Sequence, residues 1–182
     1  MLKRVVTTLL VLGASSFLNA GDDIRQIGDT SEVFIGVELG ATFVQGDTLL
    51  ELNHEGDGAS VGLRLGAQNA QWRSMAVLDY FNSDDDDQTY TRGTVQVDYY
   101  IMASDFSTAE FRPYVGVNGG YMNYESSAVG IDENGVTYGG QIGFTSAIST
   151  NVDLDMAYRY SITNPSEMDH IGNLVFGVNF LY

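Results

Sequence analysis

The last twelve residues of the chain alternate between two kinds of side chain. Every even position from Leu174 to Tyr182 is large and apolar, whereas the odd positions include Asn173, Gly177 and Asn179. A period of two is typical of a β-strand with one apolar and one polar face. A free apolar edge would recruit other chains, but an apolar face is required where a closed barrel meets lipid. The pattern therefore favours a strand of a membrane-embedded barrel over a soluble edge.

Seven further segments alternate in the same way, with turn-forming or charged stretches between them. In the first, Val33, Ile35 and Val37 share one face, and Gly36 and Glu38 share the other. We predict strands at 33–45, 59–68, 71–81, 89–102, 111–124, 136–148, 152–161 and 171–182, with ends defined to about two to four residues. The predicted fold is all-β: an eight-stranded antiparallel up-and-down transmembrane β-barrel.

The charged residues of these segments lie on the polar face, and the apolar face carries none. A charge on the lipid face costs about 2–4 kcal/mol at the bilayer midplane, whereas a paired charge inside a barrel is tolerated. Five cations and five anions therefore predict a lumen plugged by Arg–carboxylate pairs, with Glu38–Arg64 as the best candidate. The ten predicted lumen residues are Glu38, Arg64, Arg73, Asp79, Arg92, Asp98, Arg112, Asp153, Asp155 and Arg159.

The connections alternate in character. Those after the first, third, fifth and seventh segments are long and acidic, whereas the others are mostly shorter. This asymmetry predicts acidic loops outside the cell and both termini in the periplasm. One loop contains Asp84, Asp85, Asp86 and Asp87, which could hold a divalent cation, but it lacks the glycine and ligand spacing of a calcium loop. A solvated loop tip is the favoured interpretation, with no dedicated metal site.

The N-terminus has the pattern of an export signal. Lys3 and Arg4 precede an apolar run too short to span a membrane, and Leu18-Asn19-Ala20 supplies a cleavage site. We predict a signal peptide at 1–20, a periplasmic segment at 21–32 and an outer-membrane barrel at 33–182. The formal net charge of −16 argues against nucleic acid as a partner. With no cysteine, the chain has neither a disulfide nor a lipidated N-terminal Cys.

Two motifs resemble those of a known family. GVNFLY at 177–182 resembles the C-terminal signal read by the barrel-assembly machinery, although Phe is commoner than Tyr at the last position. FRPYVGV at 111–117 resembles the opening of a fifth strand. The chain thus resembles the small eight-stranded outer-membrane barrels of Gram-negative bacteria, of the OmpA-transmembrane-domain, OmpX and opacity-protein type. The resemblance implies an assembly signal at Gly177, Phe180 and Tyr182, and outer-membrane lipid and lipopolysaccharide as partners. No peptidoglycan-binding domain is expected after Tyr182.

Several functions fit these patterns. We expect a structural or surface-interaction role through the acidic extracellular loops, with an unidentified extracellular ligand. The alternative is a narrow small-solute or ion channel. Some barrels of this size modify lipid A with a His and a nearby Ser, and Asp169-His170 with Ser166 invites the comparison. Gly172 stands where that pattern would have Ser, so we expect neither an enzyme nor a cofactor. An apolar inner face would instead indicate a secreted, lipocalin-like barrel.

Overall fold

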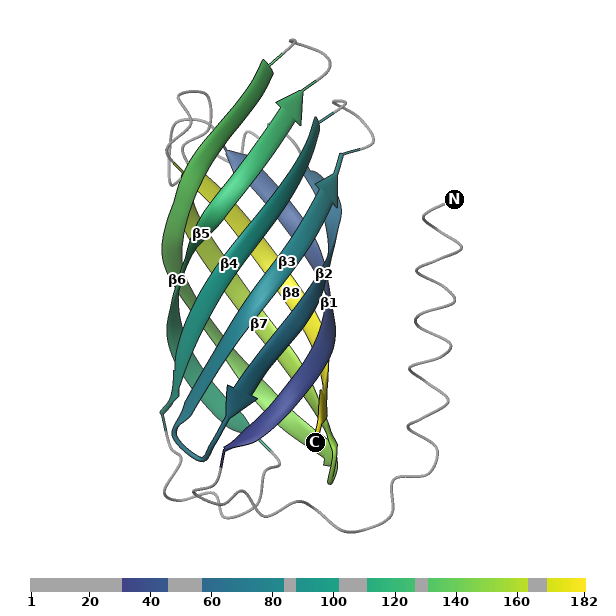
Figure 1. Cartoon of the computed structure of the whole chain (residues 1–182), viewed down its shortest axis with the longest axis vertical. Helices are drawn as coiled ribbons and strands as arrows, with labels where there is room; N and C mark the ends of the chain where they lie inside the picture. Colours follow the sequence, from purple (N-terminus) through teal and green to yellow (C-terminus); the bar gives the residue numbers. More distant parts are fainter. Residues whose placement is uncertain (1–30, 46–56, 84–87, 102–110, 127–130, 164–169) are drawn as a thin grey trace, which may run out of the picture.

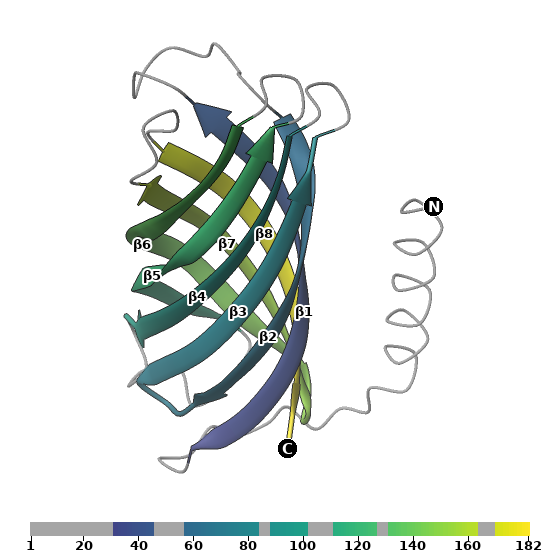
Figure 2. The ribbon, with the colours of Figure 1, turned by 45° about the horizontal axis from the view of Figure 1, so that its top comes forward.

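The computed structural model describes residues 31–45, 57–83, 88–101, 111–126, 131–163 and 170–182. They form a single closed antiparallel barrel in which the strands follow chain order (Figures 1 and 2). The strands are β1 (Glu32–Gln45), β2 (Asp57–Gln68), β3 (Trp72–Asn82), β4 (Gln88–Tyr100), β5 (Arg112–Ser126), β6 (Ile131–Ser149), β7 (Val152–Thr163) and β8 (His170–Leu181). The predicted fold class is confirmed. Within the described ranges, no helix is long and apolar enough to cross a membrane.

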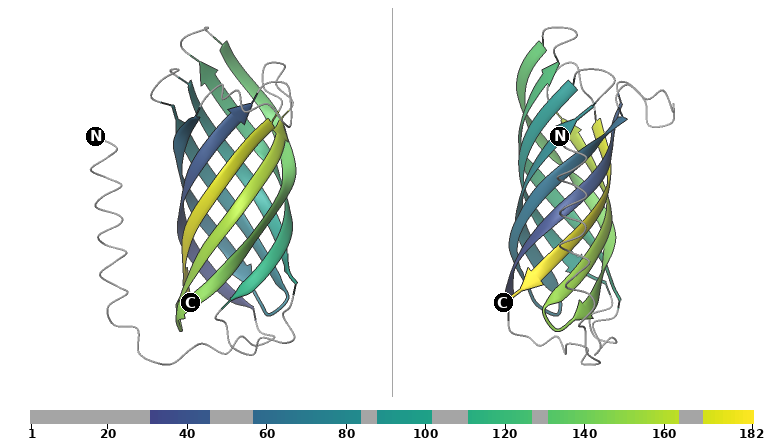
Figure 3. Two further views of the ribbon diagram at one scale, coloured as in Figure 1. Left: turned by 180° about the vertical axis from the view of Figure 1, so that it is seen from behind. Right: turned by 90° about the vertical axis from the view of Figure 1, so that its right-hand side faces the viewer.

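The barrel closes between its first and last strands. β8 pairs with β1 from Phe34↔Leu181 to Gln45↔His170, and the two lie side by side in Figure 3. β1 therefore begins at the same rim at which β8 ends. We call this the terminal rim and the opposite end the loop rim. A closed sheet has no free edge, so β8 presents no unpaired apolar edge that could recruit other chains.

The exterior of the barrel is apolar, as the alternation predicts. Its exposed side chains include Leu63, Val117 and Ile142, each at least 60% exposed. Exposed aromatic residues lie towards both rims: Trp72, Tyr99 and Phe111 at the terminal rim, and Tyr80, Tyr121 and Tyr138 nearer the loop rim. An apolar band between two aromatic girdles is the surface that a bilayer requires of a spanning barrel.

The predicted start of the sixth strand is wrong. β6 begins at Ile131 instead of residue 136, because residues 131–135 pair with β5 from Ser126↔Ile131 to Met122↔Gly135. Asp132, Asn134 and Gly135 have low strand propensity, and cross-strand pairing overrides it. On its other side β6 pairs with β7 only from Thr137 onward. The β5–β6 hairpin therefore extends past β7 at the loop rim (Figure 1).

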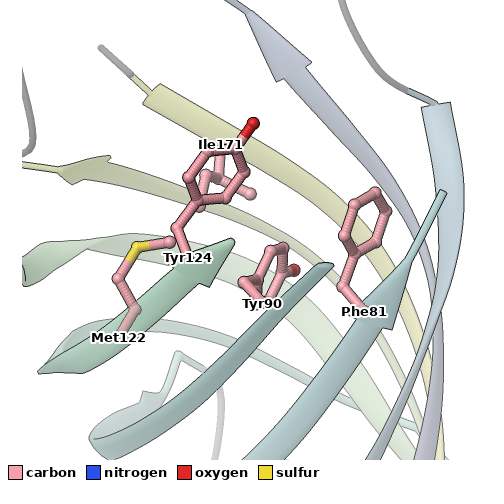
Figure 4. Packing of buried hydrophobic residues seen from close by; sticks show 5 residues of the cluster. All are labelled: Phe81, Tyr90, Met122, Tyr124 and Ile171. Atoms are coloured by element: carbon pink, nitrogen blue, oxygen red, sulfur yellow. The ribbon is translucent and has the colours of Figure 1, made fainter. Parts of the chain in front are cut away.

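The inner face is less polar than the alternation suggests. Figure 4 shows a cluster that points into the barrel near the loop rim, and two smaller clusters lie nearer the terminal rim. The first consists of Phe81, Tyr90, Met122, Tyr124 and Ile171; the others are Phe34, Met75, Val77 and Leu181, and Tyr100, Tyr114 and Ala157. In the terminal half of the barrel, charged and apolar side chains are therefore interleaved: Arg73 precedes Met75 on β3, and Arg112 precedes Tyr114 on β5.

Candidate functional site

All ten predicted lumen residues lie inside the barrel, and none is more than 4% exposed. They are carried by β1 to β5 and by β7. Small residues opposite them leave the necessary space: Glu38 faces Gly62 on β2, and Arg64 faces Gly36 on β1. Glu38 and Arg64 are therefore diagonal neighbours on the β1–β2 strand pair, and long side chains can span the distance between two such positions.

Arg64 and Arg73 meet at one carboxylate. Arg64 Nε donates to Glu38 Oε2 at 2.5 Å, and its Nη1 donates to Asp155 Oδ2 at 2.5 Å. Arg73 Nη1 donates to the same oxygen of Asp155 at 3.1 Å, and Arg73 Nε donates to Asp98 Oδ2 at 2.8 Å. These charge-assisted bonds link β1, β2, β7, β3 and β4 in one chain of contacts across the lumen.

Two further side chains turn this chain of contacts into a closed circuit. Gln141 Nε2 donates to Asp98 Oδ1 at 2.5 Å, and Gln141 Oε1 accepts from Arg159 Nε at 3.2 Å. Arg159 Nη1 then donates to Glu38 Oε1 at 3.0 Å. We call this circuit the lumen ring. Its members, in order of contact, are Glu38, Arg64, Asp155, Arg73, Asp98, Gln141 and Arg159.

The lumen ring is electrically balanced. Its three arginines face three carboxylates, and Gln141 is its neutral joint. Neighbouring groups use the remaining capacity: Tyr114 donates its hydroxyl to Asp155 Oδ1 at 2.8 Å, and Gln96 Oε1 accepts from Arg159 Nη2 at 3.3 Å. Buried charges are tolerated when they are paired and their other hydrogen-bonding sites are also filled. The arrangement meets both conditions at Asp155.

Two ion pairs lie apart from the ring. Towards the loop rim, Arg92 Nε donates to Asp79 Oδ2 at 3.1 Å, and its guanidinium lies 5.5 Å from the Tyr90 ring centroid. With its amide oriented so that both of its polar atoms are satisfied, Asn173 accepts from Arg92 Nη2 at 2.9 Å. This cation therefore has one carboxylate, one amide and one aromatic face.

The second separate pair lies towards the terminal rim. Arg112 Nη2 is 3.4 Å from Asp153 Oδ2, which also accepts from Gln68 Nε2 at 2.6 Å. The Arg112 guanidinium lies 4.1 Å from the ring centroid of Tyr100, whose hydroxyl donates to Gln68 Oε1 at 2.9 Å. Cation–π contact and hydrogen bonding together hold this pair.

In the structure Glu38 and Arg64 form an ion pair, as the sequence predicts. The structure also shows contacts that the sequence analysis missed. Glu38 is shared with Arg159, Arg64 is shared with Asp155, and Gln141 completes the circuit. Gln141 carries a weak signal in the sequence, because it is the long polar side chain on the inner parity of the sixth segment. Its two partners, however, lie on β4 and β7, and alternation along one strand does not show which partners face it.

The remaining predicted sites are less closely grouped. Gly177 lies on the inner face of β8 and is buried, whereas Tyr182 is 82% exposed at the terminal rim and Phe180 lies on the outer face. The four aspartates at 84–87 and the predicted signal peptide lie outside the described residues. Among the described residues, no three His, Asp or Glu side chains gather in a way that could hold a metal ion.

His170 lies in the described chain at the start of β8. It is 8% exposed, and its ring lies 5.3 Å from that of Tyr160, centroid to centroid. Ser166 and Asp169 fall outside the described residues. The described contacts therefore place His170 in a packed position against an aromatic ring.

Comparisons with known proteins identify the fold. No family model matches the chain, and neither does any curated protein. The crystal structure of Neisserial surface protein A (NspA) superposes with a TM-score of 0.66 at 17% identity, covering 83% of this chain and 98% of that one. The solution structure of outer membrane protein H (OprH) from P. aeruginosa gives 0.58 at 20% identity, covering 83% and 99%. Together with the apolar exterior, this likeness shows that the chain has the fold of a small eight-stranded outer-membrane β-barrel.

Proposed function

We propose that this protein is a non-enzymatic outer-membrane barrel with a plugged lumen, whose acidic loops contact ligands at the cell surface. The separation of charge carries the proposal. Five arginines and five carboxylates cancel inside the barrel, so the formal net charge of −16 comes entirely from other residues. The lumen is then a neutral internal support, and the charge available to partners lies elsewhere on the chain.

The plug is supported by the size of the barrel and by the lumen ring. An eight-stranded barrel has an interior only just wide enough for its own side chains. Here the ring joins β1, β2, β3, β4, β6 and β7, and its contacts cross the lumen instead of following one wall. The apolar cluster near the loop rim, whose side chains point into the barrel (Figure 4), is the second part of the proposed plug.

The surface role is supported by where the cations are. Every arginine in the described part of the chain is one of the five buried in the lumen, and that part holds no lysine. The described exterior thus offers no cation to the phosphates of lipopolysaccharide. We infer that contact with lipopolysaccharide runs through divalent cations held between acidic loop residues and phosphates, and that other ligands are cationic.

A narrow channel is the second candidate. Hydroxyl and amide side chains line the loop half of the lumen, where they would suit a water path: Thr42, Ser60, Thr94, Asn118, Thr137 and Ser161. In this view the lumen ring is a gate, and breaking one of its ion pairs opens it.

Planar-bilayer recording of the refolded protein separates the two functions. The plugged barrel is expected to be electrically silent at neutral pH. Steady conductance that changes in Glu38→Gln would overturn the plug and favour the channel. A variant that retains the lumen and lacks residues 47–56 provides the binding arm: it should bind less Mg²⁺ and lipopolysaccharide than the full chain, whereas equal binding rejects the loop role.

We also propose the expected route to the membrane: residues 1–20 act as a cleaved signal peptide, and the barrel-assembly machinery reads the motif that holds Gly177, Phe180 and Tyr182. The side chains of Phe180 and Tyr182 lie on the outer side of the barrel, where a partner could contact them. Deleting Tyr182 is expected to lower the amount of inserted barrel in cells and to leave a protease-sensitive periplasmic pool. Normal insertion of the truncated chain would contradict the signal.

A further inference from the structure

Gly177 differs from the other residues of the C-terminal motif in the face that it occupies. On the inner side of β8 it lies opposite Glu38 of β1 and opposite Asp155 of β7. These two residues are the carboxylate partners of Arg64. The glycine therefore lies between the two ends of the contact that Arg64 makes across the barrel.

The Arg64 guanidinium occupies the space where a side chain at position 177 would begin. A Cβ built on Gly177 would overlap Arg64 Nη1 and would lie 2.5 Å from Cζ and 3.0 Å from Nη2. Arg64 has little freedom to move away, because Nε is bonded to Glu38 and Nη1 to Asp155. A glycine is the residue that permits so close an approach.

The contacts of the lumen ring thus pass over β8. Arg64 of β2 reaches Asp155 of β7, and Arg159 of β7 reaches Glu38 of β1, while β8 lies between β7 and β1. β8 and β1 are the strands whose pairing closes the barrel (Figure 3). The ring therefore holds together the strands on either side of the closing strand.

We propose that Gly177 is a positioning residue: by leaving room for the Arg64 guanidinium over β8, it allows the lumen ring to join β7 to β1 across the closure of the barrel. This role is separate from the assembly signal and from the question of conduction. It predicts that the loss of stability caused by a side chain at position 177 depends on which residue occupies position 64.

A double-mutant cycle between positions 177 and 64 tests the proposal. The barrel is refolded into lipid vesicles without assembly machinery, and folding is followed by heat-modifiable gel mobility and urea unfolding. Gly177→Ala is expected to lower the urea midpoint clearly in the native background. In the Arg64→Ala background the same change should shift it little, because the clash is gone. Equal shifts in the two backgrounds overturn the proposal.

The test still decides the matter if Gly177→Ala fails to fold. Folding of the Gly177→Ala/Arg64→Ala chain would then support the proposal, and failure of both chains would overturn it provided that Arg64→Ala alone folds. Gly140→Ala is the matched control, since a Cβ there meets only the carbonyl oxygen of Gly116 at 3.5 Å. It should leave the midpoint unchanged or raise it slightly.

Two further measurements distinguish positioning from signalling. The Nε–H resonance of Arg64 should be protected in the native barrel and shifted or lost in Gly177→Ala, while that of Arg92 stays in place. Deleting Tyr182 should lower insertion in cells and leave the refolded urea midpoint unchanged. If Gly177→Ala behaves like the Tyr182 deletion in both assays, the glycine serves the signal alone and the proposal fails.

Discussion

Two kinds of ion pair lie in the same lumen, and they differ in how many partners each charge has. In the lumen ring, Glu38 accepts from Arg64 and Arg159, and Asp155 accepts from Arg64 and Arg73. Nearer the loop rim, Asp79 is the one carboxylate that contacts Arg92 in the described chain.

The comparison shows that similar residues stabilise a barrel interior in two ways. A network spreads the loss of one member over several neighbours, whereas an isolated pair concentrates it on one charge. The stability lost when a carboxylate is neutralised should therefore depend more on the contacts that its arginines keep than on the number of hydrogen bonds that are lost. Each prediction below concerns the free energy of unfolding of the refolded barrel in lipid vesicles, measured by urea titration.

Glu38→Gln is expected to cost the most, about 3–5 kcal/mol, because it leaves a buried cation uncompensated. Arg159 would retain only the amide oxygens of Gln141 and Gln96. Arg64 would still have Asp155. Absence of coupling in a Glu38–Arg64 double-mutant cycle would show that this contact contributes nothing specific.

Asp79→Asn is expected to cost about 3 kcal/mol, at the lower end of the range for breaking a buried pair. Arg92 loses its carboxylate but keeps the Tyr90 face and the Asn173 oxygen. Removing the aromatic face as well, in Asp79→Asn/Tyr90→Leu, should raise the cost. An unchanged cost would mean that the ring face does not compensate the charge.

Asp155→Asn should cost less, about 1.5–3 kcal/mol, the usual range for hydrogen bonds to charged groups. Both of its arginines keep another carboxylate, Glu38 for Arg64 and Asp98 for Arg73. This prediction is the sharpest test of sharing. A loss larger than that of Asp79→Asn would contradict the idea that the network distributes the damage.

Gln141→Met is expected to have the smallest effect, about 1 kcal/mol, because it opens the ring without leaving a charge unpaired. The methionine side chain has a volume similar to that of glutamine but lacks the amide that forms hydrogen bonds. If its cost approaches that of Glu38→Gln, continuity of the circuit matters more than the pairing of its charges.

The alternation of side chains was sufficient to predict the fold, because one residue in two must face lipid on every strand. The same alternation also assigned the ten charged residues to the lumen and not to the exterior. What the pattern lacks is the curvature of the closed sheet, which brings Arg159 of β7 to Glu38 of β1 with β8 between them. Alternation orders residues along strands and between adjacent strands, and contacts across the lumen depend on the diameter and stagger of the barrel.

The extent of β6 was missed for a related reason. Asp132, Asn134 and Gly135 favour a turn when judged alone, and only their pairing partners on β5 make them part of a strand. Inner apolar residues such as Phe81 and Met122 were missed because a strand with bulky residues on both faces shows weaker alternation. In each case the missing information was the identity of the neighbour in space.

The sequence separations within the lumen have a consequence for the order of assembly. Asp79 and Arg92 are 13 residues apart and can meet when β3 and β4 form a hairpin, whereas Glu38 and Arg159 are 121 residues apart. Contacts between distant segments form late, after the chain entropy of bringing them together has been lost. The ring can therefore close around Glu38 and Arg64 only after β7 has joined the sheet. A sheet inserted into the bilayer before that point would hold ring charges that still lack some of their partners. Such a partly inserted sheet is unfavourable, so we expect the barrel to complete its insertion in one step when the final strands join.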